Sequence, residues 1–289
     1  MKLNMHIHTN HSDGKYSVKK VIDIMSEHNI SIVAITDHDR FTAIDEAKQY
    51  AKAVGIDIIN GMEVSAKNDG EIDFFDSSHS LHILAYFFDM EKVKEYYRTN
   101  NLQKNKMAIK LVSRLIEDGY LLGNLASEAK LSTTRIGEAL VERGYEKNLD
   151  NAFVNILDKN YQMYRVKSIT ISSAIEMIHL CGGKAVLAHP FELTGFMRKI
   201  SISDPQVNKI VEKLVSLGLD GIEAYYPRYN YNQIKILEKL AKKYNLFKTV
   251  GSDFHGKAED DFELLDKCCS DDSRLLSLIS NHLNKKGRW

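Results

Sequence analysis

The sequence has no net charge, few cysteines and no long hydrophobic run, and each of these absences excludes something. Lys plus Arg and Asp plus Glu each number 39 in 289 residues, so no overall field draws polyanions to the protein. This disfavours a purely nucleic-acid-binding function. No stretch approaches the roughly 20 apolar residues that cross a bilayer. The N-terminal apolar segment is interrupted at once by histidines, unlike a signal peptide, so we expect no membrane partner.

The three cysteines are Cys181, Cys268 and Cys269. An odd number with two adjacent residues does not suit a disulfide framework, and none of them has the CxxC spacing of a zinc or redox motif. Reduced thiols are typical of the cytoplasm, which is the location we predict. Nothing in the composition indicates a stable protein partner.

Strand-like runs alternate with amphipathic stretches along most of the chain. Period-two or continuous apolar patterns predict strands at 3–10, 31–36, 56–66, 81–89, 184–190, 219–227 and 246–256. Helical patterns fall at 17–30, 42–55, 170–182, 204–218, 230–245 and 271–285. The polar segment 67–80 is typical of a turn or hairpin. About seven βα units predict an α/β fold with a mostly parallel sheet, either open or closed into a barrel.

Residues 91–168 break this alternation, because their pattern is helical and they are too long for one crossover. We interpret them as a helical insertion lobe beside a main domain. That domain would consist of residues 1–90 and 169–289.

A short stretch near the N-terminus, HIHTNHSDG, holds three of the eleven histidines. His6 and His8 are two residues apart on the first predicted strand, so their side chains point to the same face. Leu3, Met5 and Ile7 take the other face. One HxH pair is weak evidence by itself, because any strand can carry one.

Further imidazoles and carboxylates lie at or just beyond the ends of predicted strands, with Asp13 in the turn after the first. They are Asp13, His38, Glu63, His189, Asp253 and His255. Ligands gather at the carboxyl ends of parallel strands, and nitrogen and carboxylate donors suit Zn, Mn or Fe. The joint pattern therefore predicts a metal site with open coordination for hydrolysis. His82 opens its strand rather than closing it, so its position leaves its role undecided.

Several motifs, in this order, resemble those of the PHP (polymerase and histidinol phosphatase) superfamily. They are HIHTNHSDG, ITDHD, GMEVSA, LHILAY, VLAHP and VGSDFHG. The resemblance covers residues 1–90 and 169–289. It implies a distorted (β/α)7 barrel that holds two to three divalent metal ions.

The resemblance also implies how the ligands divide among three metal positions. The first takes His6, His8, Glu63 and Asp253. The second shares Glu63 and takes His82 and His189. The third takes Asp13, His38 and His255.

Within the superfamily, the chain resembles most the stand-alone branch of nucleoside 3′,5′-bisphosphate phosphatases and 5′→3′ exonucleases. The stretch STTRIGEALVERGY resembles that branch's insertion motif, but Thr133 stands where Arg is usual and Arg135 where His is usual. Tyrosines also replace common histidines in AYYPRY. Arg135 and Arg228 are candidate phosphate clamps, because guanidinium binds phosphate through two hydrogen bonds. Tyr226 is a candidate for stacking on a base.

These residues predict a hydrolase of phosphoric ester bonds. The expected nucleophile is a metal-bound hydroxide held by Glu63 and His189. The expected partner is a phosphorylated small molecule or a short oligonucleotide, and the substrates that we favour are nucleoside 3′,5′-bisphosphates or the 5′ ends of oligonucleotides. Two alternatives stay open. One is a phosphatase for a small metabolite such as histidinol phosphate, and the other is a metal-bound module that binds nucleic acid without turnover.

Overall fold

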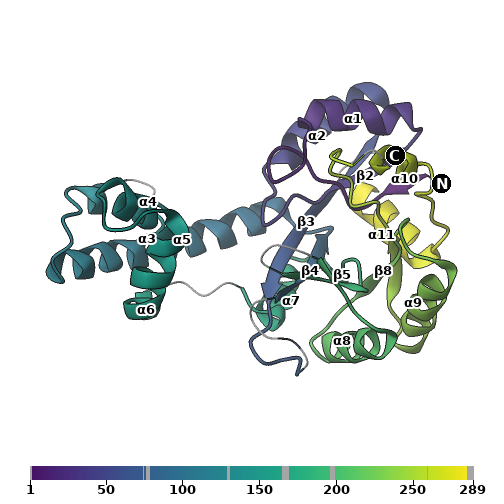
Figure 1. The fold of residues 1–289 in the computed structure, drawn as a ribbon. Helices are drawn as coiled ribbons and strands as arrows, with labels where there is room; N and C mark the ends of the chain where they lie inside the picture. Colours follow the sequence, from purple (N-terminus) through teal and green to yellow (C-terminus); the bar gives the residue numbers. More distant parts are fainter. Residues whose placement is uncertain are drawn as a thin grey trace. The chain divides into compact units, whose positions relative to one another are not determined.

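The computed structural model describes residues 2–73, 75, 79–128, 131–164, 169–195, 199–258 and 260–284. The chain divides into two compact units (Figure 1). One consists of Met1–Lys92 with Ile169–Trp289, and the other of Val93–Ser168. Among the described residues, no helix combines the length and apolar character needed to span a bilayer.

The first unit is built on a mixed sheet of nine strands. They are β1 (Leu3–Asn4), β2 (Ile32–Ile35), β3 (Asp57–Lys67), β4 (His79–Tyr86), β5 (Lys184–Leu187), β6 (Glu192–Gly195), β7 (Lys199–Ser201), β8 (Gly221–Tyr225) and β9 (Phe247–Val250). Seven of them follow the order β1-β2-β3-β4-β5-β8-β9, and the β6–β7 hairpin pairs with β4 outside this path. The neighbouring pairs are parallel, except that β4 runs antiparallel to both β3 and β5.

The first and last strands of this order come together, so the sheet is nearly closed. Met5 N–H donates to the Val250 carbonyl at 2.9 Å, and His8 N–H donates to the Phe254 carbonyl at 2.9 Å. This is the expected distorted (β/α)7 barrel. The distortion arises because β4 reverses direction.

Helices surround the sheet of the first unit (Figure 1). They are α1 (Val18–Glu27), α2 (Ala43–Val54), α7 (Ile171–Leu180), α8 (Asp204–Ser216), α9 (Tyr231–Lys243), α10 (Asp261–Leu265) and α11 (Ser273–Asn284). Their apolar stripes face inward, as α1 illustrates with Val21, Ile22 and Met25 fully buried. Ser17 caps α1 through a bond from Lys20 N–H to its hydroxyl, which satisfies an otherwise orphaned donor.

Several elements differ from the sequence-based expectation, among them the short helix α10, which was not predicted. The regular part of the first strand ends at Asn4. Beyond it the pairing with the end of β2 is irregular, since Ile7 N–H donates to the Thr36 hydroxyl. The β6–β7 hairpin was not predicted, since its strands have only four and three residues, too few for a clear period.

The second unit contains only helical elements among its described residues. They are most of α3 (Met90–Glu117), η1 (Leu125–Ser127), α4 (Thr133–Glu142), α5 (Leu149–Asn151), the π-helical turn η2 (Ala152–Leu157), α6 (Asp158–Asn160) and η3 (Gln162–Tyr164). It has its own buried cluster, which includes Leu111, Leu115, Ile136 and Leu140. The insertion thus has an independent core.

Candidate metal centre

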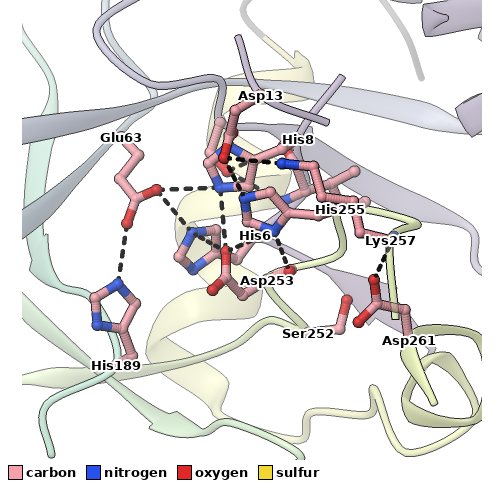
Figure 2. A network of polar contacts seen from close by, with 12 residues as sticks. His6, His8, Asp13, Glu63, His189, Ser252, Asp253, His255, Lys257 and Asp261 are labelled. Atoms are coloured by element: carbon pink, nitrogen blue, oxygen red, sulfur yellow. Dashed lines mark hydrogen bonds and ion pairs between the residues drawn. The ribbon is translucent and has the colours of Figure 1, made fainter. Parts of the chain in front are cut away.

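The nine predicted ligands lie together at the carboxyl-terminal edge of the parallel strands. His6 and His8 follow β1, His38 follows β2, and Glu63 lies within β3. His189 follows β5, and Asp253 and His255 follow β9. Figure 2 shows seven of these side chains converging from different strands. Two of them have positive φ angles, His189 (+25°) and Asp253 (+55°), and such strain is common where a backbone must aim a functional side chain.

Four buried side chains form the innermost group, His6, His8, Glu63 and Asp253. His8 Nε2 lies 3.1 Å from Glu63 Oε2 and 3.1 Å from Asp253 Oδ1. His6 Nε2 lies 3.3 Å and 3.2 Å from the same two oxygens. Two imidazoles and two carboxylates therefore point at one small space.

A second group surrounds Asp13, whose side chain is half exposed. It comprises His8, Asp13, His38 and His255. His255 Nε2 lies 3.2 Å from Asp13 Oδ2, and His8 Nδ1 lies 3.5 Å from Asp13 Oδ1. The Nδ1 of His255 is held 2.8 Å from the Asp253 carbonyl oxygen, which orients the ring.

The third group centres on Glu63 and includes His38 and His82. His82 Nδ1 lies 2.7 Å from Glu63 Oε1, and His189 Nε2 lies 3.2 Å from the same oxygen. His82 reaches this edge because β4 is antiparallel, so the beginning of β4 lies beside the ends of β3 and β5. Its ambiguous position in the sequence is explained by this reversal.

The side chains of the innermost group are better placed to bind a cation than to hydrogen-bond to one another. His6 Nε2, His8 Nε2 and Glu63 Oε2 are buried, and among the described residues none has a hydrogen-bond partner of suitable geometry. Two donors each about 2.1 Å from a tetrahedral ion lie about 3.4 Å apart. The observed separations of 3.1–3.3 Å are close to that value.

The electrostatics of the group also favour a cation. Burial lowers the pKa of His8, but the carboxylates of Asp253 and Glu63 outweigh it and raise that pKa to about 9. Burial raises the pKa of Glu63, yet the imidazoles of His82 and His6 hold it well below its usual range. Positive charge is thus strongly favoured deep in the site, and a divalent ion would supply it.

Two residues at the site were not found from the sequence. Glu223 on β8 is fully buried, with one oxygen 3.0 Å from His6 Nδ1 and the other accepting from His189 N–H at 2.8 Å. The sequence feature that could have identified Glu223 is the presence of a carboxylate within an apolar strand. Lys257 is exposed and places Nζ 3.5 Å from Asp13 Oδ2. It follows the DFHG motif, but an exposed loop lysine carries no sequence signal that separates it from other surface lysines.

The predicted substrate residues lie in different places. Arg228 is partly exposed and pairs with Asp261 at 2.9 Å and also with Asp260. Tyr226 is buried, with its ring centroid 6.5 Å from that of His189. Arg135 belongs to the helical unit, where it pairs with Glu128 at 3.2 Å and Glu142 at 3.1 Å. Their contacts with substrate stay predictions.

Several curated proteins are similar to this chain over most of their length. The first is a 5′-3′ exoribonuclease of Haemophilus influenzae, 27% identical over 88% of this chain and 90% of its own. A phosphoribosyl 1,2-cyclic phosphate 1,2-diphosphodiesterase of Eggerthella lenta is 25% identical over 88% and 94%. A 3′,5′-nucleoside bisphosphate phosphatase of Chromobacterium violaceum is 22% identical over 89% and 88%.

A solved structure supports the fold. An amidohydrolase from Chromobacterium violaceum superposes with a TM-score of 0.55 at 23% identity, covering 88% of both chains. The PHP domain family matches residues 4–183, which is more than half of the chain. The protein therefore belongs to the PHP domain family.

Proposed function

We propose that this protein hydrolyses phosphate esters of nucleotides, or of the 5′ ends of short oligonucleotides, with the help of two to three divalent ions. The observation that carries the proposal is the convergence of nine imidazole and carboxylate side chains in three overlapping groups. A mixed nitrogen and oxygen donor set without cysteine suits Mn, Fe or Zn.

The ligand sets implied by the family resemblance are compatible with these groups. His6, His8, Glu63 and Asp253 would hold one ion, and Glu63 with His82 and His189 a second. Asp13, His38 and His255 would hold a third. Such ions lower the pKa of bound water and neutralise the oxygens of a phosphoryl group.

The chain's own cations would position the substrate. Lys257 has an exposed ammonium group beside Asp13, so it can donate to a phosphate oxygen at the outer side of the site. Arg228 is held by two aspartates but remains partly exposed, and its free edge can meet a second anionic group. Tyr226 packs near His189 and shapes the wall there.

The three relatives suggest the class of substrate. Their names describe RNA, a phosphoribosyl cyclic phosphate and a nucleoside bisphosphate, and all three contain phosphate esters of ribose. At 22–27% identity they are about equally distant from this chain. We therefore propose that the substrate of this protein contains a phosphate ester of ribose. We propose a cytoplasmic location only because the three cysteines do not suit a disulfide framework.

A substrate panel tests this function. Protein freed of metal with a chelator would be reconstituted with Mn²⁺ or Zn²⁺ and given adenosine 3′,5′-bisphosphate, a 5′-phosphorylated RNA pentamer, histidinol phosphate and p-nitrophenyl phosphate. We expect metal-dependent release of phosphate or mononucleotide from the first two. Preference for histidinol phosphate would instead favour a metabolite phosphatase, and RNA binding without any release would favour a non-catalytic module.

A further inference from the structure

Glu223 connects two parts of the metal centre that are distant in the sequence. It lies on β8 with no exposed surface, between the segment that carries His6 and the segment that carries His189. Its two carboxylate oxygens have separate contacts. Oε1 lies 3.0 Å from His6 Nδ1, and Oε2 accepts from His189 N–H at 2.8 Å.

The contact with His189 requires Glu223 Oε2 to be an acceptor, because a backbone N–H can only donate. At the other oxygen, the 3.0 Å contact favours the His6 tautomer whose proton lies on Nδ1 and is donated to Glu223 Oε1. The other nitrogen, Nε2, then faces Glu63 and Asp253 at 3.3 Å and 3.2 Å, where a lone pair can bind a cation.

We infer that Glu223 is a positioning residue that makes His6 bind metal through Nε2 and fixes the backbone that carries His189. This inference rests on the proposed metal-dependent function. Partners outside the ligand set commonly fix the tautomer and orientation of ligating histidines. Here one carboxylate would do so for one proposed ligand and anchor the main chain of another.

The surrounding packing leaves Glu223 little freedom to choose other partners. A Cβ built on Gly251 would lie 2.6 Å from Glu223 Oε1 and would collide with His6. The backbone directly after β9 thus closes over the Glu223–His6 pair. His189 has a φ of +25°, an uncommon angle for a non-glycine residue, and the hydrogen bond from its N–H to Glu223 stabilises that conformation.

Glu223→Gln tests the inference with little change in shape. Glutamine offers one acceptor and one NH₂ group, so it cannot accept from both His6 and His189. We expect the affinity for Zn²⁺, measured by calorimetry on the metal-free protein, to fall about 10- to 100-fold. The metal-free variant also loses a buried acceptor, so its melting temperature should fall as well. A purely structural role would lower the melting temperature and leave Zn²⁺ affinity unchanged.

Asp220→Asn is the matched control. Asp220 also has a histidine ring nitrogen at one oxygen, that of His179 at 2.7 Å, and accepts from a backbone N–H, that of Ala185 at 2.9 Å. It precedes β8 and so lies at the opposite edge of the sheet. We expect its Zn²⁺ affinity to equal that of the wild type. An equal loss of Zn²⁺ affinity in Asp220→Asn and Glu223→Gln would overturn the inference.

Nitrogen NMR of the zinc-loaded wild type gives a second readout. The inference expects His6 to keep its proton on Nδ1 and to bind zinc through Nε2, and binding through Nδ1 would overturn it. A wild type that binds no divalent ion would refute the proposed function itself. Wild-type zinc binding that Glu223→Gln leaves unchanged would refute only the role of Glu223.

Discussion

Glu63 is the side chain on which the proposed metal sites depend most. Its two carboxylate oxygens lie within 3.3 Å of five imidazole nitrogens, those of His6, His8, His38, His82 and His189. The single buried charge of Glu63 is therefore shared by most of the proposed metal-binding histidines.

Glu63→Gln removes that charge and keeps the volume. We expect turnover to fall at least about 100-fold, since even partners outside the ligand set change metal affinity by 10- to 100-fold. Elemental analysis should find fewer bound ions, while the melting temperature of the metal-free protein changes much less. Glu27→Gln, on an exposed residue at the end of α1, is the control. Near-normal turnover of Glu63→Gln would contradict the shared role.

Lys257→Met tests the proposed phosphate contact next to Asp13. A charge-assisted hydrogen bond is worth about 1.5 kcal/mol at the weak end, and 1.4 kcal/mol is a factor of ten. We therefore expect KM to rise about 10-fold for every phosphate ester, with metal content unchanged. Lys267→Met, at another exposed lysine, should have no effect. An unchanged KM for Lys257→Met would remove this residue from the site.

Arg135→Ala tests whether the helical unit takes part in substrate recognition. If its guanidinium leaves Glu128 or Glu142 for a second phosphate, its loss should raise KM for a nucleoside bisphosphate about 10- to 100-fold. Hydrolysis of p-nitrophenyl phosphate should barely change, because it has no second anionic group. Steady-state kinetics on both substrates, with Glu142→Gln as the control, would show this. Equal losses on both substrates would indicate a role at the reacting phosphate or in the lobe's own fold.

At the scale of elements, the sequence predicted the barrel but not its irregular parts. The fold class and the PHP resemblance are confirmed by the structure and by the family match. The amphipathic stripes of α1, α8 and α9 were long enough to show the helical period. The β6–β7 hairpin was too short to show one, and the direction of β4 depends on strand pairing, which periodicity does not report.

Glu223 shows why part of the site escaped prediction. A carboxylate within an apolar strand is unusual, but its partners are His6, 217 residues earlier, and His189. Only the closure of the barrel brings them together. Lys257 escaped for another reason, because an exposed lysine in a loop has the same sequence signature whether or not it faces a ligand.

Gly251 follows β9 directly and packs closely against His6 and Glu223 at the metal centre. Gly251→Ala would force its methyl group against His6 and Glu223. Overpacking of this kind destabilises by about 1–3 kcal/mol, and here it should also reduce metal content. Gly182→Ala is the control, because Gly182 has φ +75° with no atom within 4 Å of a built Cβ. It should lose stability but keep its metal. Thermal unfolding and elemental analysis would compare the two.

At the scale of the whole molecule, each unit has its own buried core. One cluster in the barrel unit includes Leu3, Leu84, Val186 and Phe247, and that of the helical unit lies within residues 108–161. Neither of these clusters uses residues of the other unit.

Replacing residues 93–168 by a Gly/Ser linker tests this independence. A linker of about 12 residues has a root-mean-square span of about 20 Å. We expect a cooperatively unfolding protein that binds as much metal as the full chain and still hydrolyses p-nitrophenyl phosphate. Calorimetry and metal analysis are the measurements. An insoluble or metal-free product would show that the barrel needs the helical unit to fold.

The position of the helical unit in the chain also sets an order in time. Six proposed ligands, from His6 to His82, precede it, while His189, Asp253 and His255 follow it. At a synthesis rate of 5–20 residues per second, His255 leaves the ribosome about 10–35 s after His82. During that interval, the growing chain exposes an incomplete set of metal-binding side chains. Loading of the proposed metal sites would thus be a late event in the life of each new molecule, after the helical unit has already been made.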